Sequence, residues 1–248
     1  MKVGDKYETN EGCEVEVVEY KNCGNVLIKF LDNFGHQRYV QAVHLREGRV
    51  KNPYHRSVAG VGYIGFGDFS VVKNKKLTKE YICWKSMVER CHDELVRSKR
   101  PTYKDVSLCE EWHNFQNFAK WHVEQTGSSN KGWHLDKDLL IKNNKVYCPE
   151  ACVFIPQEIN SFLAVPKKVS KTEPIGVYFE KDSGKYVACC HNGFRQKKIG
   201  RFDCVEKAYS EYASFKELLA RKLAIEWKDY LDKRAFEALM NYKTETED

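Results

Sequence analysis

The stretch KGWHLDKDLLIKNNKVYCPEACVFIPQEIN, residues 131–160, decides how the middle of this chain folds. It predicts a strand-like arm that ends in LDKD at residues 135–138, and a turn rich in Asn and Lys follows. An apolar strand, Val153–Ile155, comes next, and a helix that carries Asn160 begins at Pro156. The expected order of elements is therefore strand, strand, helix.

Two kinds of oxygen ligand gather in this stretch. Asp136 and Asp138 supply paired carboxylates at the end of the first strand, and Asn160 supplies an amide on the helix. Carboxylate and amide oxygens are ligands that hard divalent cations prefer, and such a site leaves room for a phosphate oxygen on the metal. The stretch therefore predicts a layout of two strands and a helix that holds one hard cation against a phosphate.

The composition bounds the class of protein. The 248 residues allow two or three small domains, and contents of 42% hydrophobic and 13% aromatic residues are enough to bury real cores. No apolar run approaches the roughly 18 residues that span a bilayer, and the N-terminus has no apolar segment typical of a secretory signal. We therefore expect a cytoplasmic protein with no membrane partner, whose ten cysteines are core thiols or metal ligands rather than disulfides.

The net charge of +6 is unevenly distributed. Residues 1–60 carry nine Lys/Arg against eight Asp/Glu, whereas residues 167–201 carry nine Lys/Arg against three acids. A basic excess concentrated in one short segment favours a phosphate-binding face over a generally solvated surface.

The N-terminal segment, residues 1–60, is predicted to be a small β-barrel or SH3-like module. Cys13–Tyr20 and Asn25–Leu31 alternate in the manner of strands, tight turns separate them, and Gln37–Val43 makes a third strand. The segment is either a structural module or a docking module for nucleic acid or protein.

The central segment, residues 61–166, is predicted to contain two aromatic-rich helices before the strand–strand–helix unit. Lys79–His92 places its apolar residues on one face at helical spacing, and Glu110–Glu124 repeats that pattern. We interpret the aromatic side chains of both helices as core.

The C-terminal segment, residues 167–248, is predicted to be a three-stranded sheet followed by helices. The strands are Ile175–Glu180, Lys185–Cys190 and Arg195–Phe202, and Asn192-Gly193 is typical of a two-residue hairpin turn. Helices over Val205–Glu217 and Arg221–Tyr242 complete an α+β chain.

Residues 79–160 resemble a family of phage and bacterial HNH (ββα-metal) endonucleases. The motifs that carry the resemblance are W-x-x-M-x-x-R-C from residue 84, C-x-E-W-x-x-F-x-x-F from residue 109, LDKD from residue 135, and Y-x-P-E-x-C-x-F followed by Asn160. The resemblance implies cleavage of double-stranded DNA with Mg²⁺ or Mn²⁺.

The family pattern can be carried over to individual residues with two departures. Asp136 matches the metal-binding Asp, and Asn160 matches the ligand on the helix. Lys137 stands where the family has its catalytic His, and Ala151 stands where many members have Asn. A protonated Lys is a poor base at neutral pH, because its unperturbed pKa is about 10.4.

His134 and Asp138 are the nearby groups that could orient or deprotonate the water instead. The departures leave two hypotheses open, a variant nuclease or an inactive descendant that only binds DNA as a regulator. Structural Zn²⁺ on Cys91, Cys109, Cys148 and Cys152 is a further alternative, which the irregular spacing disfavours.

Residues 174–215 are similar to AP2-type DNA-binding domains. The matching stretches are GVY at residues 176–178, KYVA at 185–188, KIGRF at 198–202 and EKAY at 206–209. The similarity implies a three-stranded sheet packed on a helix, with the sheet in the major groove, where Arg can read guanine. The candidate DNA-binding residues are Lys185, Tyr186, Arg195, Lys197, Lys198 and Arg201.

We expect Arg195 and Lys197 to point outward to DNA, and Val187 and Ile199 to face the helix. An HNH unit joined to an AP2 unit resembles homing endonucleases carried by bacteriophages, which would place the protein in the cytoplasm of a bacterial host. A protein-interaction module, with the basic strands against an acidic partner, is the third alternative.

Overall fold

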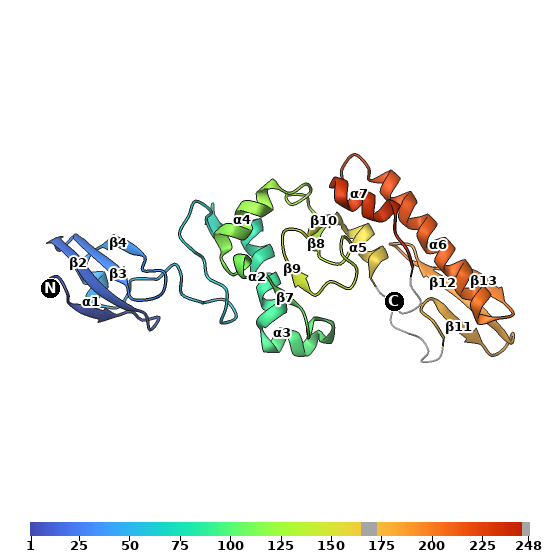
Figure 1. The fold of residues 1–248 in the computed structure, drawn as a ribbon, viewed down its shortest axis with the longest axis horizontal. Coiled ribbons are helices and arrows are strands. Elements are labelled where there is room, and N and C mark those ends of the chain that lie inside the picture. Colours follow the sequence, from blue (N-terminus) through green and yellow to red (C-terminus); the bar gives the residue numbers. More distant parts are fainter. Residues whose placement is uncertain (165–172, 245–248) are drawn as a thin grey trace. The chain divides into compact units, whose positions relative to one another are not determined.

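The computed structural model describes residues 1–164 and 173–244 and is an α+β protein with several small sheets (Figure 1). Two compact units make up the chain, Met1–Lys120 and Trp121–Asp248. The predicted domain boundary at residues 166 and 167 lies outside the described residues, as do Lys167, Lys168 and Lys171 of the basic segment. The division into three domains therefore stays a prediction.

The first unit begins with an open antiparallel sheet in the order β1-β2-β3-β4, so the described residues form no closed barrel. The strands are β1 (Lys6–Glu8), β2 (Glu14–Asn22), β3 (Asn25–Phe30) and β4 (Gln37–Val40). The third predicted strand ends at Val40 rather than Val43, because helix α1 (Ala42–Arg46) begins there. Ala42 and Leu45 of α1 join the apolar residues of β2 and β3 in one core.

The rest of the first unit is mainly helical. Its elements are β5 (Val72–Lys73), β6 (Lys76–Leu77), α2 (Lys79–His92), α3 (Glu94–Lys99), the 3-10 helix η1 (Pro101–Tyr103), β7 (Ser107–Leu108) and the 3-10 helix η2 (Glu110–His113). The predicted bounds of α2 are confirmed. The predicted helix 110–124 is divided at Asn114, which is extended and accepts the backbone N–H of Gln116 through its side chain. Helix α4 (Phe115–Glu124) follows. The boundary between the two units falls within this helix, between residues 120 and 121.

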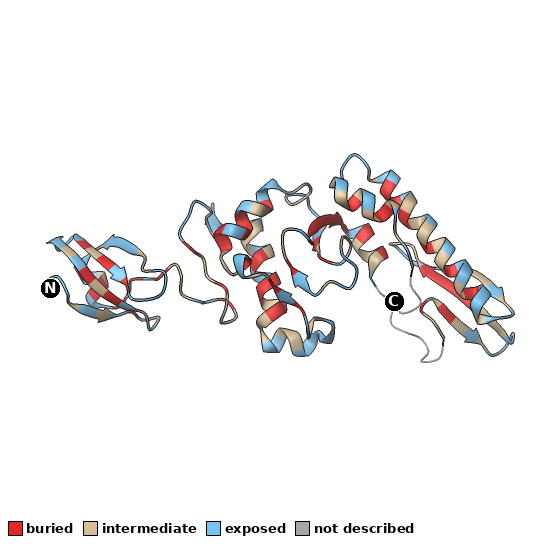
Figure 2. Cartoon of the chain, viewed as in Figure 1, coloured by how far each residue is buried: buried red, intermediate tan, exposed pale blue. Residues whose placement is uncertain are grey.

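The second unit contains the predicted strand–strand–helix order. Strand β8 (Trp133–Asp136) pairs antiparallel with β10 (Val153–Pro156), and helix α5 (Gln157–Leu163) follows directly. A short strand, β9 (Val146–Tyr147), lies between them in the chain. The four residues of β10 are all buried, as Figure 2 shows.

The C-terminal sheet has the predicted three strands in the order β11-β12-β13. They are β11 (Val177–Glu180), β12 (Lys185–His191) and β13 (Gln196–Phe202). The predicted two-residue turn at Asn192-Gly193 is wrong, because the β12–β13 loop has four residues. The Asn192 side chain accepts the backbone N–H groups of Phe194 and Arg195 and so stabilises this longer loop.

The C-terminal helices also differ from the prediction. Helix α6 (Val205–Glu226) continues through the predicted break near residue 218, and the chain leaves the helix at Trp227. Helix α7 (Lys233–Met240) begins after Asp232, whose side chain caps it by accepting the Arg234 N–H. The described part of the chain has no helix long and apolar enough to cross a membrane.

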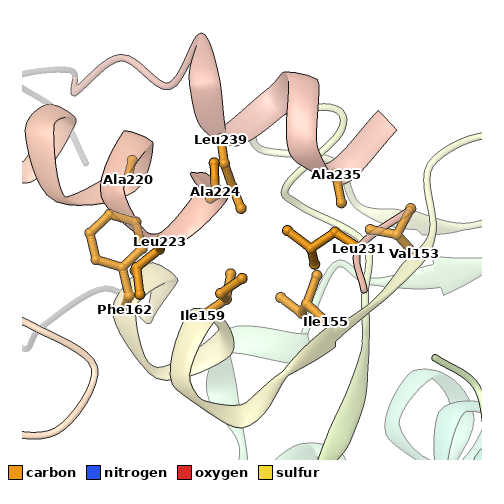
Figure 3. Close-up of a cluster of buried hydrophobic side chains, with 10 residues drawn as sticks. All are labelled: Val153, Ile155, Ile159, Phe162, Ala220, Leu223, Ala224, Leu231, Ala235 and Leu239. Atoms are coloured by element: carbon orange, nitrogen blue, oxygen red, sulfur yellow. The ribbon is translucent and has the colours of Figure 1, made fainter. Parts of the chain in front are cut away.

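Helix α6 contributes to two cores. Its N-terminal half packs against the sheet through Ala208 and Tyr212. Its C-terminal half joins α7, α5 and β10 in a second cluster, drawn in Figure 3: Val153, Ile155, Ile159, Phe162, Ala220, Leu223, Ala224, Leu231, Ala235 and Leu239. One continuous helix therefore connects the strand–strand–helix unit to the C-terminal sheet.

Candidate functional site

The register of β8 and β10 places two predicted site residues on one face. Asp136 lies opposite Val153 and His134 lies opposite Ile155, and directly opposite residues of an antiparallel pair share a face. Val153 and Ile155 pack in the same cluster as Ile159 of α5. His134 and Asp136 therefore lie on the face of the strand pair that α5 covers.

Asn160 lies on α5, one turn after the end of β10. It follows the buried Ile159, and its own side chain is half-buried. Helix α5 contacts both β8 and β10. The structure thus brings the helix that carries Asn160 against the strand that carries Asp136, as the expected layout requires.

The Asp136 carboxylate is partly held by backbone donors. Its Oδ1 accepts the N–H of Asp138 at 3.0 Å and the N–H of Leu139 at 2.7 Å, which fixes the chain where it leaves β8. Burial raises the pKa of Asp136 above its usual value, and the two backbone hydrogen bonds oppose that shift. A nearby divalent cation would favour the ionised form, and Oδ2 takes part in neither hydrogen bond.

Lys137, the departure from the family pattern, is a buried structural residue. Its Nζ lies 2.5 Å from Asp138 Oδ1, 2.9 Å from the carbonyl oxygen of Asn144 and 5.9 Å from the centre of the Tyr147 ring. Asn144 returns a hydrogen bond to the Lys137 carbonyl. Lys137 therefore holds the loop after β8, and Asp138 is engaged by its ammonium group.

His134 is the better placed of the two candidate bases. It is exposed on β8 and lies two residues before Asp136 on the same face. The backbone positions of such neighbours are separated by about 6.5–7 Å along a strand. Ala151, the second departure, is buried in the turn before β10.

Asp136 and Asn160 are two oxygen donors, which suits a cation that takes most of its ligands from substrate and water. Among the described residues, no group of three or more His, Cys, Asp or Glu side chains could hold a metal ion. Mg²⁺ is usually bound through one or two protein oxygens together with phosphate and water, so Asp136 and Asn160 suit it. The cysteines of the described residues are all free thiols, and they form no group of three or more ligands that could hold structural Zn²⁺.

The core against α6 identifies the two faces of the C-terminal sheet. Ala188 and Cys190 of β12 belong to this core, so their neighbours Val187 and Cys189 point to the opposite face. Among the described residues, no helix of this core covers that face, and we call it the open face, although Val187 and Cys189 are themselves buried on it. Residues directly opposite them share that face. The open face therefore also carries Tyr178 and Arg201 beside Val187, Lys198 beside Cys189, and Glu180 opposite Lys185.

Glu180 holds two of the candidate DNA-binding side chains. Its carboxylate lies 2.5 Å from Nε of Arg201 and 3.1 Å from Nζ of Lys198. The hydrogen bonds from Arg201, Ser183 and Lys198 lower the pKa of Glu180 to about 2. Lys185 pairs with the exposed Asp203 at 3.1 Å.

The predicted facing of Val187 and Lys197 is wrong. Lys197 lies opposite Cys190 on the helix side, with its Nζ 5.0 Å from the centre of the Phe215 ring. Lys197 and Ile199 are alternate residues of β13 and therefore share the helix side, whereas Val187 lies between Ala188 and Cys190 and points away from it. Lys198 and Gly200 pair with consecutive residues of β12, so a β-bulge leaves one extra residue between them. That extra residue, Ile199, packs on the helix side as predicted.

Two further candidates lie away from the open face. Tyr186 is on the helix side, partly buried in the core with α6. Arg195 is exposed in the β12–β13 loop. Of the six candidate DNA-binding residues, the sheet therefore brings Lys185, Lys198 and Arg201 together.

Glu158 of α5, which was not predicted as a site residue, links the strand–strand–helix unit to the C-terminal sheet. A Cβ at Gly193 of the β12–β13 loop would lie 3.0 Å from Glu158 Cγ, so that loop packs directly on the first turn of α5. The Glu158 carboxylate also accepts the indole N–H of Trp227 at 3.1 Å. A glycine in the loop was the only sequence signal for this close approach.

The chain matches no protein-family model, no curated protein and no solved structure.

Proposed function

We propose that this protein binds double-stranded DNA through the open face of β11–β13 and hydrolyses phosphodiester bonds at Asp136 with Mg²⁺ or Mn²⁺. The observation that carries the proposal is the position of His134 and Asp136 on the face covered by α5. The first turn of α5 in turn packs against the loop of the sheet that presents Lys198 and Arg201. DNA bound on the basic face would therefore lie at a fixed distance from the carboxylate.

Each site residue has a distinct role in the proposed reaction. Asp136 and Asn160 would hold the cation, which when bound supplies positive charge to the phosphate and its developing negative oxygens. His134 accepts the proton of the attacking water as the water oxygen bonds to phosphorus. The bond from phosphorus to the leaving sugar oxygen breaks, and that oxygen takes a proton from solvent. Lys137 keeps the loop after β8 in place, and the Asp138 carboxylate neutralises the charge of the Lys137 ammonium group.

Nicking of supercoiled DNA tests the proposal. Purified protein is incubated with the DNA and Mg²⁺, Mn²⁺ or EDTA, beside Asp136→Ala, His134→Gln and the matched control Asp229→Ala. Asp229 is an exposed carboxylate in the α6–α7 connection of the same unit. We expect metal-dependent nicking that Asp136→Ala abolishes, that His134→Gln lowers about 10²–10⁴-fold, and that Asp229→Ala leaves unchanged. Equal nicking by Asp136→Ala would refute the assignment.

A second candidate function is DNA binding without cleavage. The structural role of Lys137 favours DNA binding without cleavage. Lys137 stands where HNH endonucleases have their catalytic His, and its ammonium group donates to Asp138 and to the Asn144 carbonyl oxygen of the loop after β8. This candidate predicts salt-sensitive duplex binding with no nicking under either metal. The protein would then act as a sequence-specific regulator.

A further inference from the structure

The N-terminal β module carries a depression lined by basic side chains. A cavity of about 520 Å³ opens beside β4 and α1, and its charged lining residues are Arg38, Arg49 and Lys51, together with His44. A second depression of about 430 Å³ shares His44, Arg49 and Lys51 with the first and adds Glu11. Three of the nine Lys and Arg residues of the module line this depression, although the net charge over residues 1–60 is only +1.

Two of the three permanent cations have no counter-ion among the described residues. Arg38 and Lys51 are exposed and make no ion pair within residues 1–164 and 173–244. Arg49 pairs only with Glu47, and both side chains are half exposed, so that pair contributes little. Glu11 accepts the backbone N–H of Asn52 at 3.3 Å.

The nearest strand acids point elsewhere. Glu19 reaches the hydroxyl of Tyr39 on β4 at 2.7 Å. Consecutive strand residues point to opposite faces, so Arg38, which precedes Tyr39, points away from Glu19. The first depression therefore presents the charges of Arg38 and Lys51 to solvent without an ion-pair partner among the described residues.

We propose that this depression binds phosphates of the DNA backbone, which makes the N-terminal β module a second DNA contact. The inference rests on the proposed function, since it takes the same duplex as the ligand. Arginine presents a planar fork of donors that matches phosphate oxygens, and Lys51 adds a point charge. Contacts to phosphate carry no base information, so the module adds affinity rather than sequence preference.

The test measures duplex binding by the full chain as a function of salt. The dissociation constant for a 30-base-pair duplex is measured by fluorescence anisotropy from 50 to 300 mM NaCl. The variants are Arg38→Gln/Lys51→Gln in the module, Lys198→Gln/Arg201→Gln in the sheet, and Lys21→Gln as the control. Lys21 belongs to the same module but already pairs with Glu19. Thermal unfolding confirms that each variant is folded.

Loss of two phosphate contacts lowers the salt slope by about 1.8, and we expect a fall in affinity of about tenfold for Arg38→Gln/Lys51→Gln. Lys21→Gln should leave both quantities unchanged. If wild type binds and only the sheet variant weakens binding, the module contact is refuted while the proposed function stands. If wild type binds no duplex at 50 mM NaCl, both are refuted.

Discussion

Lys137 holds the loop after β8 through contacts that a shorter histidine side chain could not all make. Its ammonium group has three donors on a flexible stem, and it reaches Asp138, the carbonyl of Asn144 and the edge of Tyr147. An imidazole has two nitrogens and no such reach. The Lys at this position therefore has a structural explanation, and in the proposed reaction His134 is the residue that would activate water.

In the proposed function, Glu180 would limit how much positive charge the open face presents to DNA. Its carboxylate neutralises part of Arg201 and Lys198, and it would lie close to the phosphates that these cations contact. We predict that Glu180→Gln raises duplex affinity about threefold or more, because an exposed negative charge is removed from a phosphate-binding face. Asp182→Asn, an exposed change in the same hairpin, is the control and should have a smaller effect.

The gain from Glu180→Gln should not depend on pH between 5.5 and 8. The pKa of Glu180 is lowered to about 2, so the wild-type carboxylate is ionised throughout this range and begins to take up protons only in much stronger acid. Dissociation constants measured at both pH values check this. A gain present at pH 8 and lost at pH 5.5 would contradict the pairing of Glu180 with Arg201 and Lys198.

At the scale of the elements, the contact between β11 and α6 depends on a residue with no side chain. Gly176 lies just before β11 with a φ of +82°, and a Cβ there would meet the Tyr212 ring at 2.3 Å. The helix therefore packs directly on the backbone of the chain as it enters the sheet.

We predict that Gly176→Ala lowers the free energy of unfolding by about 2–5 kcal/mol. The left-handed backbone costs an L-residue about 1–2 kcal/mol, and the forced displacement of Tyr212 adds about 1–3 kcal/mol. Gly184→Ala is the matched control, because its φ is +65° and its Cβ would meet nothing within 4 Å. In urea unfolding, Gly184→Ala should lose only the free energy that the left-handed backbone costs. Equal losses of unfolding free energy for Gly176→Ala and Gly184→Ala would disprove the close packing of Tyr212 on Gly176.

At the scale of the whole second unit, α6 makes the site and the basic sheet one folded body. Leu223 is buried in the cluster with β10, α5 and α7 (Figure 3). Ala208 and Tyr212 of the same helix are buried against the sheet. We therefore expect a disturbance in one core to affect the other through this continuous helix.

We predict that Leu223→Ala lowers the free energy of unfolding of this unit by about 2–5 kcal/mol. Amide hydrogen exchange should accelerate together in β10, α5 and β12, since the two cores share α6. Leu218→Ala on the same helix is the control, because Leu218 is 64% exposed and should change exchange little. Faster exchange confined to β10 and α5 would mean that the two cores unfold separately.

Local pattern determined much of this chain. The period of about 3.6 in Lys79–His92 gave the bounds of α2, and alternation gave the strands of the C-terminal sheet to within a residue or two. The order of β8, β10 and α5 also followed from the stretch at residues 131–160. These features depend on neighbours in the chain, which is why a sequence can carry them.

Tertiary structure decided which side chains meet. Strand β12 buries Ala188 and Cys190 against α6 and so turns Val187 away from that helix, and Lys197 shares the helix side with Ile199, against the faces predicted from the sequence. The continuity of α6 past residue 218 follows from the apolar surfaces of β10 and α5 that it covers. By itself the sequence determined the elements and the candidate ligands. The ion pairs of Glu180 with Arg201 and Lys198 and the union of two cores on α6 required long-range packing, because each joins residues distant in the chain.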